Sequence, residues 1–133
     1  MSESELYKKG REVRRKLMGD AMVENMSSTV YNSPIMEKFG QYTSEAIFGM
    51  LWSRPGLDLK TRTLICVISD TSTARWPELE IHLRMALRQG WTEDELGEVL
   101  LHLGGYIGVP SVREAMIIAN KVFTEVAAEG SGD

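Results

Sequence analysis

The chain of 133 residues contains a single cysteine, Cys66. One thiol excludes a disulfide within the chain, a zinc cluster built on several cysteines, and a Cys-x-x-Cys redox pair. The sequence also lacks a signal-peptide pattern, because Met1 is followed at once by polar and acidic residues. No apolar run approaches the ~20 residues of a membrane-spanning helix. We therefore expect a cytoplasmic protein with no membrane contact.

Basic charge is scarce as well. Fifteen Lys and Arg residues stand against nineteen Asp and Glu residues, which gives a net charge of -4. Because nucleic-acid binding depends on clustered cations, no nucleic-acid partner is expected. A local basic cluster between Lys8 and Lys16 is interpreted as the solvated face of a helix, and a patch for an acidic partner is the alternative.

Motifs for common cofactors are missing. The sequence has no Gly-x-Gly-x-x-Gly, no Walker loop and no Gly-x-Ser-x-Gly elbow. Its two histidines, His82 and His102, show no His-x-x-x-His or Glu-x-x-His spacing, so we expect neither metal nor another cofactor. His102 lies between leucines and is interpreted as a packing residue. Cys66 lies in an apolar run, where a thiolate nucleophile is disfavoured.

Helical patterning is what the sequence does contain. With 43% hydrophobic residues, the chain is expected to form one all-α domain of about six helices over residues 1–128, followed by a disordered tail at 129–133. A capping box of Ser2 and Glu5 predicts a helix to about Leu17. Residues 22–29 are helical or irregular, and Ser33-Pro34 begins a helix that reaches about Trp52.

The second half contains an ambiguous segment and several clear helix starts. Residues 64–68 are rich in β-branched side chains and could form a strand, but Asp58 as a cap and the helical neighbours favour a helix. Pro77 opens a helix that ends near residue 88 or 89, with Gly90 in the left-handed conformation. Thr92 and Glu95 form a capping box, and that helix should end around residues 104–105.

After a connector at 106–110, a second capping box of Ser111 and Glu114 predicts the last helix. Its apolar stripe is wider than one packing face requires, which indicates contacts with other subunits.

One stretch carries groups suited to acid–base chemistry. In a helix that starts at Pro77, Glu78 and His82 are four residues apart and share a face, and Arg75 lies just before the helix. A carboxylate that orients an imidazole is the arrangement of an acid–base catalyst. A surface Glu–His pair without function is the alternative that the spacing leaves open.

Five segments, taken in order, resemble the γ-carboxymuconolactone decarboxylase family: residues 52–58, 61–63, 75–82, 86–90 and 106–110. The resemblance extends from about Tyr7 to Val126. It implies an all-α fold, assembly into a homo-oligomer such as a trimer or hexamer, and sites near subunit interfaces. It also implies kinship with AhpD-like peroxidases, whose two cysteines correspond here to Arg75 and Glu78. Disulfide-based peroxidase chemistry is therefore excluded.

The resemblance further implies decarboxylation of γ-carboxymuconolactone, a small lactone, to 3-oxoadipate enol-lactone in the protocatechuate branch of aromatic-acid catabolism, without a cofactor. His82 would donate a proton, Glu78 would orient it, and Arg75 would bind a carboxylate or the developing oxyanion. Arg54 and Arg62 could also bind the substrate, and the alternatives are that Arg54 fixes a turn and Arg62 forms an ion pair. Trp52 and Tyr106 would line the pocket.

Met50 departs from the family pattern. The helix before the Arg-Pro-Gly turn often reads Trp-Gly-Glu-x-Trp in the family, whereas this chain has Met50 in place of the glutamate. One alternative is therefore a related lyase, isomerase or cyclase acting on another unsaturated lactone or cyclic carbonyl compound. A second alternative is a non-catalytic helical oligomer that binds a small ligand.

Overall fold

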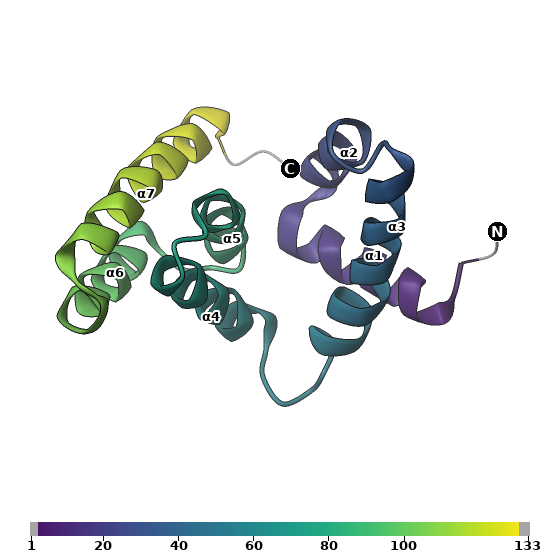
Figure 1. Cartoon of the computed structure of the whole chain (residues 1–133), viewed down its shortest axis with the longest axis horizontal. Coiled ribbons are helices and arrows are strands. Elements are labelled where there is room, and N and C mark those ends of the chain that lie inside the picture. The colour runs from purple at the N-terminus through teal and green to yellow at the C-terminus, as the bar shows by residue number, and fades with distance from the viewer. Residues whose placement is uncertain (1–2, 131–133) are drawn as a thin grey trace. The chain divides into compact units, whose positions relative to one another are not determined.

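The structure, a computed structural model, describes residues 3–130, and all regular secondary structure in this range is helical (Figure 1). The predicted all-α class is confirmed. The described residues contain seven α-helices and one π-helix, compared with the expected total of about six helices. They form two compact units, one ending at Asp58 and the other beginning at Leu59. None of the described helices is long and apolar enough to cross a membrane.

The first unit begins with α1 (Glu5–Met18), whose cap differs from the predicted one. Ser4 is the N-cap, and its hydroxyl accepts a hydrogen bond of 3.0 Å from the backbone N–H of Tyr7. The expected cap, Ser2, lies outside the described residues. The helix buries Val13 and Leu17, and its basic residues are exposed except Arg14, which is half-buried. The predicted solvated basic face is therefore correct at every position but one.

Residues 20–51 contain three further helices. The segment left open by the sequence is helical, as α2 (Asp20–Thr29). Ser33 caps α3 (Pro34–Thr43) as predicted, with its hydroxyl accepting from the Met36 N–H. The expected single α-helix to Trp52 is wrong, because the chain continues as a π-helix, η1 (Ser44–Leu51). The Trp52 N–H accordingly donates to the carbonyl of Ile47, five residues back, at 2.8 Å.

Two glycines bring α1 and η1 into backbone contact. A Cβ atom on Gly10 would lie 1.8 Å from the carbonyl oxygen of Ser44, and one on Gly49 would lie 2.3 Å from that of Leu6. No real side chain fits at such distances. Glycine is therefore required at both positions for this packing.

The second unit consists of α4 (Leu59–Ser72), α5 (Trp76–Arg88), α6 (Glu93–Ile107) and α7 (Val109–Glu129) (Figure 1). The β-branched segment at 64–68 is helical within α4, as predicted. One apolar core joins the four helices, and its buried members are Val67, Leu79, Leu83, Ala86, Leu96, Leu100, Val112, Ala115, Ala119 and Val122.

The start of α6 follows the sequence prediction closely. Thr92 accepts from the Glu95 N–H, and Glu95 accepts from the Thr92 N–H, both at 3.0 Å. Gly90 has the predicted left-handed conformation, with φ of 105°. Trp91, just before α6, makes a long-range hydrogen bond to α4: its indole N–H donates to the carbonyl of Lys60 at 2.8 Å.

The junction of α6 and α7 corrects two predictions. Helix α6 does not end at residues 104–105 but continues to Ile107, and only Gly108 breaks the helix, with φ of 101°. Helix α7 then begins at Val109, so Ser111 and Glu114 lie inside it and make no capping box. A proline is compatible with the first turn of a helix, so Pro110 does not need a connector before it. Glu129, the first residue of the predicted disordered tail, is helical, so the prediction is wrong at that residue, and residues 131–133 lie outside the described residues.

Candidate active site

The turn between α4 and α5 sets the position of the predicted acid–base residues. Ala74 has φ of 58°, the one left-handed residue other than glycine among those described. This reversal lets the backbone N–H of Arg75 donate to the carbonyl of Asp70 at 2.9 Å. Helix α5 then starts at Trp76, with Pro77 in its first turn. The turn thus brings the last turns of α4 next to the first turns of α5.

His82 on α5 meets Asp70 on α4. The Nδ1 atom of the histidine lies 2.5 Å from Oδ2 of the aspartate, and the two side chains are 21% and 10% exposed. An ionised carboxylate only accepts hydrogen bonds, so beside it the Nδ1 atom is the donor. The other ring nitrogen, Nε2, has no hydrogen-bond partner among the described residues. A nearly buried carboxylate that fixes one imidazole nitrogen is typical of acid–base sites.

Asp70 therefore holds the place that the sequence suggested for Glu78. Glu78 is exposed, one helical turn before His82, and no described hydrogen bond joins the two side chains. The orienting carboxylate comes instead from another helix, twelve residues earlier in the chain. One sequence feature points to it: Asp70 follows the apolar run of α4, and a carboxylate buried in such a helix requires a partner.

The remaining predicted site residues of the second unit differ in how far their side chains are exposed to solvent. Arg75 is exposed at the N-cap of α5, and its side chain makes no capping hydrogen bond. Arg62 is half-buried on α4. Tyr106 on α6 is 79% exposed, and its ring lies 5.2 Å from that of His102. His102 is itself exposed, so its interpretation as a packing residue is wrong.

Trp52 and Arg54 belong to the first unit. Trp52 is only 6% exposed, and its ring centroid lies 6.0 Å from that of Phe48. Arg54 is exposed in the turn after η1. Met50, the residue that departs from the family pattern, is 58% exposed. Of the predicted site residues, Glu78 and His82 therefore share helix α5, and Arg75 is the N-cap residue of that helix.

Helix α5 is also fixed on the side of α7. Arg84 donates to Glu125 at 2.8 Å and to Glu129 at 3.1 Å, and Lys121 donates to Glu80 at 2.7 Å. These pairs are partly exposed, so each contributes modestly to stability. Glu80 is accordingly engaged in a surface ion pair.

Cys66 lies one turn before Asp70 on α4. Burial raises the pKa of this thiol to about 11, and the nearby charge of Asp70 adds to the effect. The thiol is therefore protonated at neutral pH, which agrees with the expectation that Cys66 is no nucleophile. Among residues 3–130, no group of three or more His, Cys, Asp or Glu side chains is arranged to hold a metal ion.

Comparison with known proteins identifies the family. The model of the carboxymuconolactone decarboxylase family matches residues 37–121. The chain belongs to this family. It is 34% identical over 126 residues to a 4-carboxymuconolactone decarboxylase of Acinetobacter baylyi, an alignment that covers 95% of this chain and 92% of the relative.

A second relative has a different substrate in its name. The chain is 35% identical over 127 residues to a nitrosuccinic acid decarboxylase of Metarhizium robertsii, which covers 94% of this chain and 86% of that protein. A shorter match, 34% identical over 83 residues, is to an uncharacterized 15.0 kDa protein of Paracoccus denitrificans, with 61% and 62% of the chains covered. Both relatives with a named activity are decarboxylases.

Proposed function

We propose that this member of the carboxymuconolactone decarboxylase family removes CO2 from γ-carboxymuconolactone to give 3-oxoadipate enol-lactone, with His82 as the proton donor. The proposal is supported by the 34% identity to a 4-carboxymuconolactone decarboxylase along nearly the whole chain. The observation that carries the residue assignment is the hydrogen bond of Asp70 to Nδ1 of His82. This contact orients a partly exposed imidazole and leaves Nε2 available.

The decarboxylation requires a group that accepts the electron pair left by CO2, and a donor of one proton. When the bond to the carboxylate carbon breaks, its electron pair spreads through the ring alkene into the lactone carbonyl, and CO2 leaves. The resulting dienolate takes a proton at the carbon next to the carbonyl. The doubly protonated imidazole of His82 supplies that proton from Nε2, keeps the hydrogen on Nδ1 toward Asp70, and regains a proton from solvent, so atoms and charge balance.

Other side chains are proposed to stabilise charge and to hold the ring. Asp70 acts as a positioning residue, because it touches the imidazole and not the substrate. Arg75, exposed at the start of the same helix, is proposed to bind a carboxylate or the oxyanion, since a guanidinium offers two parallel hydrogen bonds. Glu78 is retained as a catalytic candidate on the face it shares with His82. Arg54, Arg62, Trp52 and Tyr106 remain proposed substrate-binding residues.

A second candidate substrate is nitrosuccinic acid. It is favoured by the 35% identity to a nitrosuccinic acid decarboxylase over 94% of this chain. Here the nitro group would accept the electron pair that CO2 leaves behind, as the lactone carbonyl does in the first reaction. The same proton donor serves both reactions, so Met50 and the other substrate-facing residues would decide between them.

The test is to assay the purified protein on both substrates and to repeat the assay with His82→Gln and Asp70→Asn. Loss of the general acid is expected to lower kcat by about 10²–10⁴-fold. Asp70→Asn should also lower kcat, by up to about 10⁴-fold, because an amide no longer fixes the hydrogen on Nδ1. Nitrogen NMR of the neutral form of His82 should show hydrogen on Nδ1 in the wild type and a mixture of the two tautomers in Asp70→Asn.

Glu80→Gln is the matched control for Glu78→Gln, because both residues are carboxylates on α5. Glu78→Gln is expected to lower turnover, whereas Glu80→Gln changes a carboxylate on the same helix that pairs with Lys121 and should leave turnover unchanged. Circular dichroism establishes that each variant is folded. A folded His82→Gln protein with wild-type turnover would remove the proposal. A wild type inactive on both substrates would instead favour a related enzyme of cyclic carbonyl compounds or a non-catalytic oligomer that binds a small ligand.

A further inference from the structure

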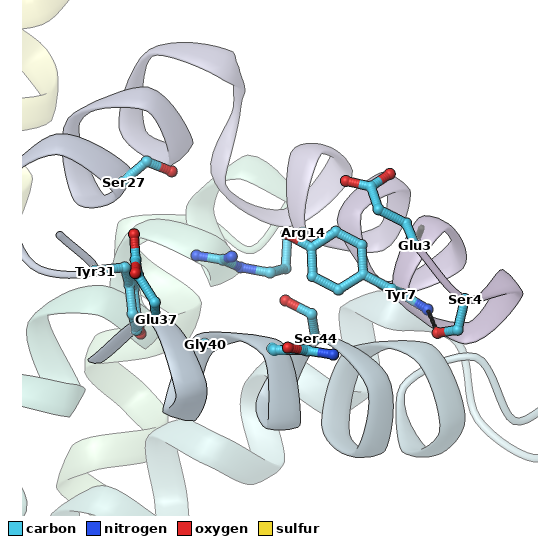
Figure 2. A pocket seen from close by; sticks show the side chains of 10 residues that line it. Glu3, Ser4, Tyr7, Arg14, Ser27, Tyr31, Glu37, Gly40 and Ser44 are labelled. Atoms are coloured by element: carbon cyan, nitrogen blue, oxygen red, sulfur yellow. Dashed lines mark hydrogen bonds between the residues drawn. The ribbon is translucent and has the colours of Figure 1, made fainter. Parts of the chain in front are cut away.

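The first unit contains a cavity that none of the predicted site residues lines. Its volume is about 370 Å³, which falls in the usual range of small-molecule sites. Its walls come from α1 and the residues just before it, α2, the segment between α2 and α3, α3, and the start of η1. They include Tyr7, Arg14, Tyr31, Gln41 and Ser44. Figure 2 shows the Arg14 side chain extending from α1 into this space.

Arg14 lacks the partner that a sheltered guanidinium normally has. Its Nε atom is buried and makes no hydrogen bond, and no ion pair joins Arg14 to another residue in the described range. Its neighbours on α1 differ, because Arg11 pairs with Glu3 at 2.9 Å and Arg15 pairs with Asp20. A buried N–H without a partner is costly, and this half-buried guanidinium has no anionic partner within the described residues, so it is suited to an anion from outside the chain.

Aromatic rings hold the guanidinium in place. Its central carbon lies 5.5 Å from the ring centroid of Tyr31 and 5.6 Å from that of Phe48. Both contacts are cation–π interactions, which orient the group without consuming its N–H donors. The cavity therefore offers one fixed cation with free donors beside the rings of Tyr7 and Tyr31.

The charges at the cavity limit the kind of anion. Glu3 and Glu37 also line it, and Glu3 is paired with Arg11, so the Glu37 carboxylate is the one that would repel a ligand with two negative charges. No ion pair within the described residues connects Glu37 with Arg14. A single carboxylate suits a single guanidinium, since the two groups can form paired hydrogen bonds. A flat apolar body would pack on the tyrosine rings.

From these observations we propose that the cavity around Arg14 binds a ring-bearing monocarboxylate. The carboxylate accepts from the guanidinium of Arg14, and the ring lies against Tyr7 and Tyr31. The site belongs to the first unit alone and does not rest on the proposed decarboxylase function, which depends on His82 and Asp70.

The test is to titrate benzoate into the full-length protein, with benzamide as the neutral analogue, and to follow binding by calorimetry and amide NMR. Benzoate should bind at least about 10-fold more tightly than benzamide, as expected when a charge-assisted hydrogen bond is lost. Its shift changes should centre on Tyr7, Tyr31 and Ser44. Equal binding of the two compounds, no binding of benzoate, or shift changes elsewhere would overturn the proposal.

Variants on α1 provide the matched comparison. Arg14→Gln should weaken benzoate binding at least about 10-fold, whereas Arg15→Gln, one residue further on and paired with Asp20, should not change it. Glu37→Gln should strengthen binding, because it removes a negative charge from the cavity wall. Wild-type affinity in folded Arg14→Gln would refute the site. If Arg14→Gln does not fold, two other results test the site. Shift changes at Tyr7, Tyr31 and Ser44 in the wild type, together with tighter binding in Glu37→Gln, would support it, and the opposite results would refute it.

Discussion

At the scale of single residues, Asp70 interacts with two neighbouring side chains. It accepts from His82 across the α4–α5 interface, and it contributes to the raised pKa of Cys66 on its own helix. The sole thiol of the chain is therefore a chemical probe of the carboxylate that positions the candidate proton donor. This link permits a test that needs no substrate.

The rate of Cys66 alkylation is expected to keep rising with pH to about 11, since only the thiolate reacts. Asp70→Asn should move this profile to lower pH, because one cause of the shift disappears. The folded pKa lies above the ordinary value of 9.0, so the thiol stabilises the fold below pH 9 and this contribution is lost as pH rises from about 9 to about 11. Iodoacetamide kinetics across pH measure the profile. An identical profile in the two proteins would show that the charge of Asp70 does not raise the pKa of Cys66.

The sequence pointed to His82 as a candidate, which stays a prediction, but the carboxylate that contacts this histidine was not predicted. The histidine lies beside other polar groups of suitable chemistry, within a single predicted helix. Its partner, Asp70, lies across a turn whose geometry depends on the left-handed conformation of Ala74. Alanine gives no indication of that conformation, so the sequence suggested Glu78, the nearest carboxylate on the same face.

At the scale of helices, the starts at Ser33 and Thr92 were predicted correctly, whereas the start of the last helix and the ends of α3 and α6 were not. The caps at Ser33 and Thr92 depend on local hydrogen bonds that the residue types specify. The change from α3 to η1 and the continuation of α6 through residues 104–105 depend on packing instead. Gly10 and Gly49 set the contact beside η1, and two residues so distant in sequence form no local pattern.

Ala74→Gly is expected to stabilise the protein by about 1 kcal/mol. A Cβ atom in the left-handed region costs roughly 1–2 kcal/mol, and the added freedom of glycine in the unfolded chain offsets part of that gain. Ala21→Gly is the control at an exposed position inside α2, where glycine should cost up to about 1 kcal/mol. Urea unfolding measures both free energies. A loss of stability in Ala74→Gly equal to that in the control would show that the turn carries no strain.

At the scale of the whole molecule, the predicted homo-oligomer stays a prediction. Several large apolar side chains of α6 and α7 are exposed, among them Leu101, Tyr106, Val109 and Ile117 at 52–79%. Exposed apolar residues in such number are typical of surfaces that meet a partner. The single domain expected for residues 1–128 likewise stays a prediction, because each of the two units is compact.

Light scattering should therefore give a mass of three or six times 14.9 kDa. Ile117→Glu is expected to lower that mass, because it places a charge among the exposed apolar side chains of α7. Asn120→Glu adds the same charge at an exposed polar position of α7 and should leave the assembly intact. A wild-type mass of one chain would contradict the oligomer.

The close approach of α1 and η1 also bears on how relatives can diverge. Even one methyl group at Gly10 or Gly49 would overlap a main-chain oxygen of the opposite helix. A homologue with any larger residue at either position must hold its first helix differently. These two glycines are thus a criterion, readable from sequence alone, for deciding which family members share this amino-terminal arrangement and the Arg14 cavity next to it.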